Sequence, residues 1–68
     1  MHLIVETERE ADGRWIAEIA ELAGVLAYGE TRDQAIARAE ALALRVLADR
    51  LDHAEAGPDL VSVSFRAA

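Results

Sequence analysis

Residues 2–19 read HLIVETER-EADG-RWIAEI, in which two alternating segments flank a turn signal. Residues 2–9 and residues 14–19 each place mainly apolar and mainly charged side chains on opposite sides with a period of two, which is typical of half-buried strands. The core side would carry Leu3, Val5, Thr7, Trp15, Ala17 and Ile19. Gly13 can take the positive φ that a tight turn between antiparallel strands requires. This stretch therefore predicts a β-hairpin with one buried face.

The shared core face limits how the two predicted strands can pair. A three-residue loop with Arg9 opposite Gly13 keeps both apolar sets on one face, whereas a two-residue Asp-Gly turn does not. The same pairing would bring Glu8 opposite Arg14 as an oppositely charged pair. We therefore expect the three-residue loop and this register.

A third strand and a helix follow the hairpin. Residues 20–24 form a connection, and residues 25–29, VLAYG, are predicted to be a strand that ends at a glycine. The sequence TRDQ from Thr31 to Gln34 matches a capping box, in which the threonine hydroxyl accepts a hydrogen bond from the N–H of Gln34 and the Gln34 side chain reaches back. A helix is therefore predicted from residue 32 to about residue 53.

The predicted helix is amphipathic, with one apolar stripe that would cover the sheet. The stripe consists of Ala35, Ile36, Ala39, Leu42, Ala43, Val46 and Leu47. Leu44 and Leu51 lie on its flank and widen it beyond what one sheet face needs. They would either contact a second subunit or pack under a neighbouring loop.

A fourth strand completes the pattern. Residues 57–59, GPD, interrupt the helical pattern, and residues 60–66 alternate again, with Val61, Val63 and Phe65 directed inward. The order strand-strand-strand-helix-strand is an α+β arrangement. Because a helix crosses over before it, the fourth strand should run parallel to the first and third strands.

Composition limits the classes of function. The 68 residues form a single domain, 1–68, and include no cysteine. A core of this size supplies only about 3–5 kcal/mol, and zinc is not expected because His2 and His53 are isolated from any thiolate. We therefore expect added stability from a homo-oligomer or a partner protein. The formal charge of −6 disfavours direct binding to nucleic acid.

Targeting signals are not evident. The first residues, MHLIVE, lack the basic start and long apolar run of a signal peptide. No uncharged apolar stretch reaches the roughly 18–20 residues of a membrane helix. The absence of cysteine is compatible with a reducing compartment. We therefore expect a cytoplasmic protein that does not bind membranes.

Catalytic chemistry is not indicated either. The serine and threonine hydroxyls have no plausible histidine base nearby, and the glycines are scattered at turns instead of forming a phosphate-binding loop. Glu6, Glu8 and Glu18 could in principle hold a divalent metal ion for a nuclease reaction, although solvated surface charge is the simpler interpretation. We expect no enzyme activity, no metal and no cofactor.

A family resemblance runs through most of the chain. Residues 12–24, DGRWIAEIAELAG, followed by YGET at 28–31 and by Gln34-Ala35, resemble the HicB-like antitoxin family. The family pattern combines an Asp-Gly hairpin, an aromatic-x-Ala strand, a Leu-x-Gly connection and a Gly-acid-Thr entry into an Ala-rich helix. Ala20 and Ala23 depart from it, because family members often carry proline there, and they often carry a small residue or cysteine near Val25.

The resemblance implies a fold and a partner. It implies a reduced RNase H-like mixed sheet of order 3-2-1-4 with one long helix on one face, and it does not imply nuclease activity. It also implies binding to the small, basic toxin HicA and blockage of its mRNA-cleaving site. Many family members continue into a C-terminal DNA-binding module, which the 68 residues lack, so operator binding is not expected of this chain.

These observations lead to two hypotheses. The first is a HicB-like antitoxin module in which an acidic hairpin attracts a HicA-type mRNA interferase and neighbouring apolar side chains make the contact. The alternative is a stand-alone oligomeric scaffold that binds protein without a toxin partner. In either case the candidate interface is Ile4, Glu6, Glu8, Ile16, Glu18, Leu26 and Tyr28.

Overall fold

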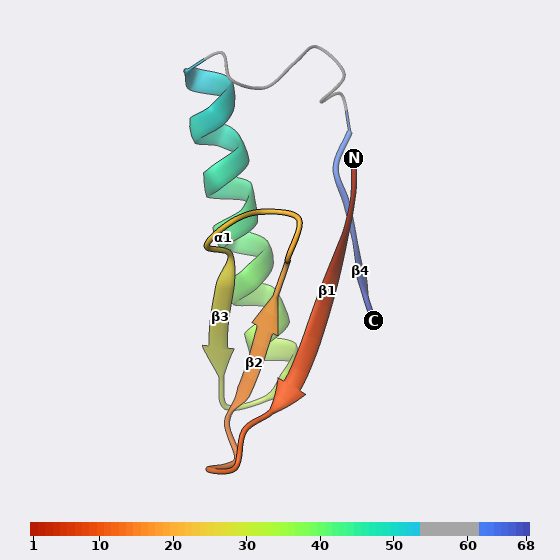
Figure 1. Cartoon of the computed structure of the whole chain (residues 1–68), viewed down its shortest axis with the longest axis vertical. Coiled ribbons are helices and arrows are strands. Elements are labelled where there is room, and N and C mark those ends of the chain that lie inside the picture. The colour runs from red at the N-terminus through yellow and green to blue at the C-terminus, as the bar shows by residue number, and fades with distance from the viewer. Residues whose placement is uncertain (54–61) are drawn as a thin grey trace.

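The computed structural model describes residues 1–53 and 62–68, and they form a four-stranded sheet with one helix on one face (Figure 1). The elements are β1 (His2–Arg9), β2 (Trp15–Glu18), β3 (Leu26–Gly29), α1 (Arg32–Asp52) and β4 (Ser64–Ala67). The strand order is β3-β2-β1-β4, in which β2 is antiparallel to both neighbours and β4 is parallel to β1. The α+β class and the strand order implied by the family resemblance are therefore confirmed.

The hairpin register differs from the expected one. Arg9 pairs with Trp15 and Glu8 pairs with Ile16, so the predicted pairing of Glu8 with Arg14 was wrong. The loop does contain three residues, but they are 11–13: the N–H of Glu10 donates to the Arg14 carbonyl at 2.7 Å, and Gly13 has a φ of 91°.

The glycine explains the difference in register. In a three-residue hairpin loop the last loop position adopts the left-handed conformation, which Gly13 does as a loop residue and not as a paired strand residue. The observed pairing is shifted by two residues from the expected one. A shift of two keeps every side chain on its predicted face.

The start of α1 is fixed by side-chain hydrogen bonds. The N–H of Gln34 donates to the Thr31 hydroxyl at 3.1 Å, as the capping box predicts. The Gln34 side chain accepts from the N–H of Glu30 at 2.7 Å, one residue before the cap. Immediately before this turn lies buried Gly29, where an added Cβ would lie 2.5 Å from the backbone nitrogen of Ala35. The first turn of α1 therefore packs directly on the backbone of β3.

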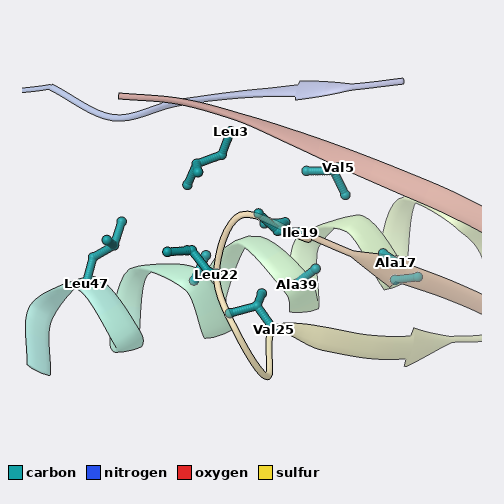
Figure 2. Packing of buried hydrophobic residues seen from close by; sticks show 10 residues of the cluster. Leu3, Val5, Ala17, Ile19, Leu22, Val25, Ala39 and Leu47 are labelled. Atoms are coloured by element: carbon teal, nitrogen blue, oxygen red, sulfur yellow. The ribbon is translucent and has the colours of Figure 1, made fainter. Parts of the chain in front are cut away.

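The core lies between the sheet and α1 (Figure 2). Its buried members are Leu3, Val5, Ala17, Ile19, Leu22, Val25, Ala35, Ala39, Ala43 and Leu47. Three of the four buried helix residues are alanines and the fourth is Leu47. Half-buried Trp15 and Phe65 pack at the margins of the core. Val61, which was expected to point inward, lies outside the described residues. No polar side chain of residues 1–53 and 62–68 is buried.

The connection between β2 and β3 contributes to this core. Leu22 was predicted only as part of a linker, yet it is 3 % exposed. Its N–H donates to the Ile19 carbonyl at 3.1 Å, and its own carbonyl accepts from Val25 at 3.2 Å, while Gly24 adopts a φ of 81°. Two tight turns thus direct the leucine side chain inward.

Two arginines of α1 attach the helix to the ends and edge of the sheet. Arg32 donates to the Thr7 hydroxyl at 3.1 Å and to the Ala68 carbonyl at 3.1 Å, which joins β1 and the end of β4 to the helix start. Arg38 donates to the Tyr28 carbonyl at 2.9 Å. Within the described part of the chain, no helix is long and apolar enough to cross a membrane.

Candidate protein interface

The sheet has one face turned away from α1, which we call the open face. It carries the side chains that alternate with the core residues on all four strands. The seven residues proposed from the sequence lie on it together, in the paired rows Glu8-Ile16-Tyr28 and Glu6-Glu18-Leu26 and, beside them, Ile4. Strand pairing therefore brings the whole predicted set onto one surface.

The open face is divided by chemistry. Leu26 and Tyr28, both on β3, are each 40 % exposed, and Ile16 beside them on β2 is half-buried. The β1 end of both rows is acidic, with Glu6 and Glu8 exposed. An apolar strip thus lies next to an acidic strip on one continuous surface.

A shallow depression lies where the two strips meet. It encloses about 150 Å³ and is lined by Glu6, Thr7, Glu8, Ile16 and Glu18. Glu6 and Glu18 are directly paired across the strands, and like charges at such positions destabilise a sheet. Within residues 1–53 and 62–68, neither carboxylate forms a salt bridge with a basic side chain. A cationic group from outside the chain would relieve this repulsion.

The Arg14 side chain, next to the hairpin turn, lies over the apolar strip. The Arg14 guanidinium carbon lies 4.7 Å from the centre of the Tyr28 ring, and its Nε donates to an Asp12 carboxylate oxygen at 2.8 Å. The backbone N–H of Arg14 and then its guanidinium hold the pKa of Asp12 below its ordinary value. Arg14 therefore places one positive charge at the β3 end of the open face.

Sequence reasoning missed this position of Arg14 because the expected register assigned it to Glu8. Two further residues were also missed. Arg66 pairs with Ile4 across β4 and β1 and brings a second positive charge to the open face, which the alternation of residues 60–66 could have indicated. A carboxylate oxygen of Glu21 accepts from the N–H of Ile4 at 3.2 Å, where β2 has left the side of β1. No periodic pattern signals that contact.

The acidic residues of the open face do not gather into a group of metal ligands. Glu6, Glu8 and Glu18 share the open face, but the structure offers no group of three carboxylate or imidazole side chains in its described residues that could hold a metal ion. Hydrolytic metal centres need such convergent ligands. The expectation that no serine hydroxyl lies near a histidine was wrong, because the pairing of β1 with β4 brings His2 Nδ1 within hydrogen-bond distance of the Ser64 hydroxyl.

No protein-family model, curated protein or solved structure matches this chain. A function must accordingly be argued from the fold and from the open face. The resemblance to HicB-like antitoxins stays a prediction from the sequence motifs.

Proposed function

We propose that this chain is a HicB-like antitoxin module that binds and neutralises a small, basic, HicA-type mRNA interferase in the cytoplasm. The observation that carries the proposal is the open face, where exposed Leu26 and Tyr28 lie beside an acidic strip that includes the directly opposed Glu6 and Glu18. A surface of this kind suits a partner that offers both basic and apolar side chains.

The fold agrees with the proposal. A sheet of order β3-β2-β1-β4 with one helix on one face is the arrangement that the family resemblance implies. Fold alone does not determine function. The agreement makes the motif resemblance in residues 12–35 compatible with the three-dimensional arrangement, and the open face supplies the functional argument.

The chemistry suggests how neutralisation would work. A toxin that cleaves mRNA needs a basic surface, because it must bind a polyanionic backbone. An acidic strip on the antitoxin competes for that surface and also accelerates the encounter through long-range attraction, which salt weakens. The apolar strip then supplies the desolvated contact that slows dissociation. Inhibition follows from occupation of the RNA-binding surface and requires no reaction by this chain.

The first experiment uses a basic protein of similar size encoded next to this chain. Co-expression should restore growth to cells poisoned by that neighbour, and the two proteins should purify as a complex whose affinity falls as salt concentration rises. A neighbour that is not toxic, or a toxic neighbour that neither forms a complex nor loses toxicity, contradicts the antitoxin proposal. In that case an oligomeric scaffold without a toxin is the favoured alternative.

Matched variants test whether the open face makes the contact. Glu18→Arg should weaken the complex at least tenfold, because it reverses a charge in the acidic strip, whereas Asp52→Arg makes the same charge change at the end of α1 and should have little effect. Tyr28→Ser should weaken the complex by removing apolar contact, whereas Leu44→Ser on the far side of α1 should not. Equal losses in test and control variants contradict the assignment of the interface.

A further inference from the structure

The solvent side of α1 carries an apolar line that the monomer does not use. Its members are Ala37, Ala41, Leu44, Ala48 and Leu51, which we call the outer seam. Leu44 and Leu51 are 51 % and 52 % exposed, which makes them the two most exposed leucines of the described residues. Neither leucine packs under a loop formed by the described residues, which was one of the two roles predicted for them.

The spacing of the outer seam is regular. Successive members are separated by four, three, four and three residues, which is the a/d repeat of a two-stranded coiled coil. The seam covers about 21 Å of helix and lies roughly 150° around the helix axis from the buried stripe. It therefore faces away from the sheet, and α1 itself lies on the sheet face opposite the open face (Figure 1).

Charged residues flank the outer seam in a fixed order. The positions on one side are Asp33, Glu40 and buried Leu47, and those on the other are Arg38, Arg45 and Asp52, so opposite charges flank the first two heptads and not the third. In a parallel pair of helices a g position meets the e position five residues further along the partner. Asp33 would then face Arg38 of a second copy, and Glu40 would face Arg45.

The opposite orientation is disfavoured by the same charges. In an antiparallel pair, g meets g and e meets e, so Glu40 would have no arginine opposite it, and Arg45 would face another arginine when the whole seam is in contact. Within residues 1–53 and 62–68, none of Asp33, Glu40 and Arg45 forms a salt bridge in the monomer. Arg38 donates one N–H to the Tyr28 carbonyl and keeps others for a carboxylate. The pairs Asp33 with Arg38 and Glu40 with Arg45 thus form in the parallel orientation only.

We propose that two copies of this chain associate through the outer seam, with their α1 helices parallel about a two-fold axis. Leu44 and Leu51 of one copy then lie against the same residues of the other, as an isologous interface requires. The sheets lie on the outside of the dimer, and both open faces stay accessible. The interface is short, so it forms a weak dimer that dissociates on dilution.

Oligomeric state gives the first test. Sedimentation equilibrium of the wild-type chain should show a concentration-dependent rise from 7.4 kDa toward twice that mass. A chain that stays monomeric across the concentration range overturns the proposal. This measurement needs no toxin, so its failure and the failure of the antitoxin proposal are independent.

Single-cysteine variants test the contact and its direction, because the chain has no cysteine of its own. Leu44→Cys and Leu51→Cys should each form disulfide-linked dimers under mild oxidation, whereas Phe65→Cys on the edge strand β4 should not. In a parallel pair, residue 44 lies beside residue 44 of the second copy, and residue 51 lies beside residue 51. In an antiparallel pair, at most one of these two positions can lie beside its own counterpart. Cross-linking of Leu51→Cys to Ala37→Cys, or cross-linking at residue 65 alone, contradicts the proposed arrangement.

Charge reversal tests the orientation without a cross-link. Glu40→Arg places arginine opposite Arg45 of the partner and should weaken dimerisation roughly tenfold, since two symmetric pairs become repulsive. Glu40→Arg combined with Arg45→Glu restores opposite charges and should recover the dimer. If Glu40→Arg leaves association unchanged or strengthens it, Glu40 does not face Arg45 of a second copy and the proposal is wrong. Circular dichroism of each variant checks that the fold is kept.

Discussion

Arg14 lies over the ring of Tyr28, with 4.7 Å between its guanidinium carbon and the ring centre, and so joins the hairpin tip to the edge strand β3. Asp12 holds the guanidinium in place through a bond of 2.8 Å from Nε. Asp12 and Arg14 precede β2, and they lie near Tyr28 because β2 pairs with β3. Their contacts make the hairpin tip part of the open face.

Replacing Arg14 should loosen this arrangement. Arg14→Ala removes an exposed cation–π contact and the partner of Asp12, and should lower the free energy of unfolding by about 0.5–1 kcal/mol. Urea unfolding followed by tryptophan fluorescence measures the change. Arg14→Lys keeps the charge but not the planar fork, so it should recover only part of the loss. Full recovery by lysine would show that stacking of the planar group adds nothing.

Asp12 should add a small dependence of stability on pH. Its pKa in the folded state is lowered by the Arg14 N–H and guanidinium, so the folded chain holds this proton less tightly than the unfolded chain. The stabilisation of the fold by ionised Asp12 is therefore complete above the pKa that Asp12 has in the unfolded chain, and it is lost as pH falls through the pKa that Asp12 has in the folded chain. The difference in stability between wild type and Asp12→Asn should be constant above about pH 5 and should shrink below about pH 4. A difference that grows on acidification would reverse the sign of this argument.

Gly29 should not tolerate a side chain. Gly29→Ala would bring a methyl group 2.5 Å from the Ala35 nitrogen, which displaces the first turn of α1 and should cost about 1–3 kcal/mol. Gly24→Ala is the matched control, because its φ of 81° disfavours alanine while nothing lies within 4 Å of the added atom. The control should lose about 1 kcal/mol from backbone strain alone. If both variants lose the same free energy of unfolding, the first turn of α1 can move away from residue 29 at no cost.

The helix cap also contributes to stability. Thr31→Ala removes the acceptor of the Gln34 N–H and should cost about 1 kcal/mol, whereas Thr31→Asp supplies another acceptor and should cost little. Thermal unfolding followed at 222 nm compares the two variants. If both lose the same amount, the hydroxyl is not the group that matters.

A single large core truncation should unfold the chain. Ile19 is fully buried between β2 and α1, and Ile19→Ala should cost about 2–5 kcal/mol. A core of this size supplies only about 3–5 kcal/mol in all, so the variant should be largely unfolded by circular dichroism. Ile19→Val should stay folded with a loss of about 0.5–1.5 kcal/mol. Leu26→Ala, which changes an exposed leucine on the open face, serves as the control.

The sequence was sufficient to predict which side each strand buries, and the limits of that prediction are physical. Burial on one face leaves a two-residue pattern, and this pattern separated Val5 and Ala17 from Glu6 and Glu18 correctly. A shift of two residues leaves the same pattern unchanged. The register therefore depended on the φ of Gly13, and an incorrect loop position misplaced the partner of Arg14.

The candidate interface was predictable only as a set of positions. The same alternation that defines the core also places Leu26 and Tyr28 on the open face. The contacts made across it depend on register and on irregular turns, as for Glu21, whose carboxylate reaches the N–H of Ile4. Neither a repeat nor a local motif encodes such contacts. The helix contained a clearer signal, because the cap at Thr31 is a local hydrogen-bonded motif that needs no tertiary partner.

The bond from Arg38 to the Tyr28 carbonyl affects more than the attachment of α1. The N–H of Ile19, directly after β2, donates to the Val25 carbonyl, directly before β3. Because the bonded pairs of an antiparallel ladder alternate, the backbone groups of Tyr28 point away from β2 at the outer edge of the sheet. Unpaired groups at such an edge recruit further strands and can begin fibril growth. By occupying the Tyr28 carbonyl with a charged side chain, α1 makes this edge a poor template for aggregation.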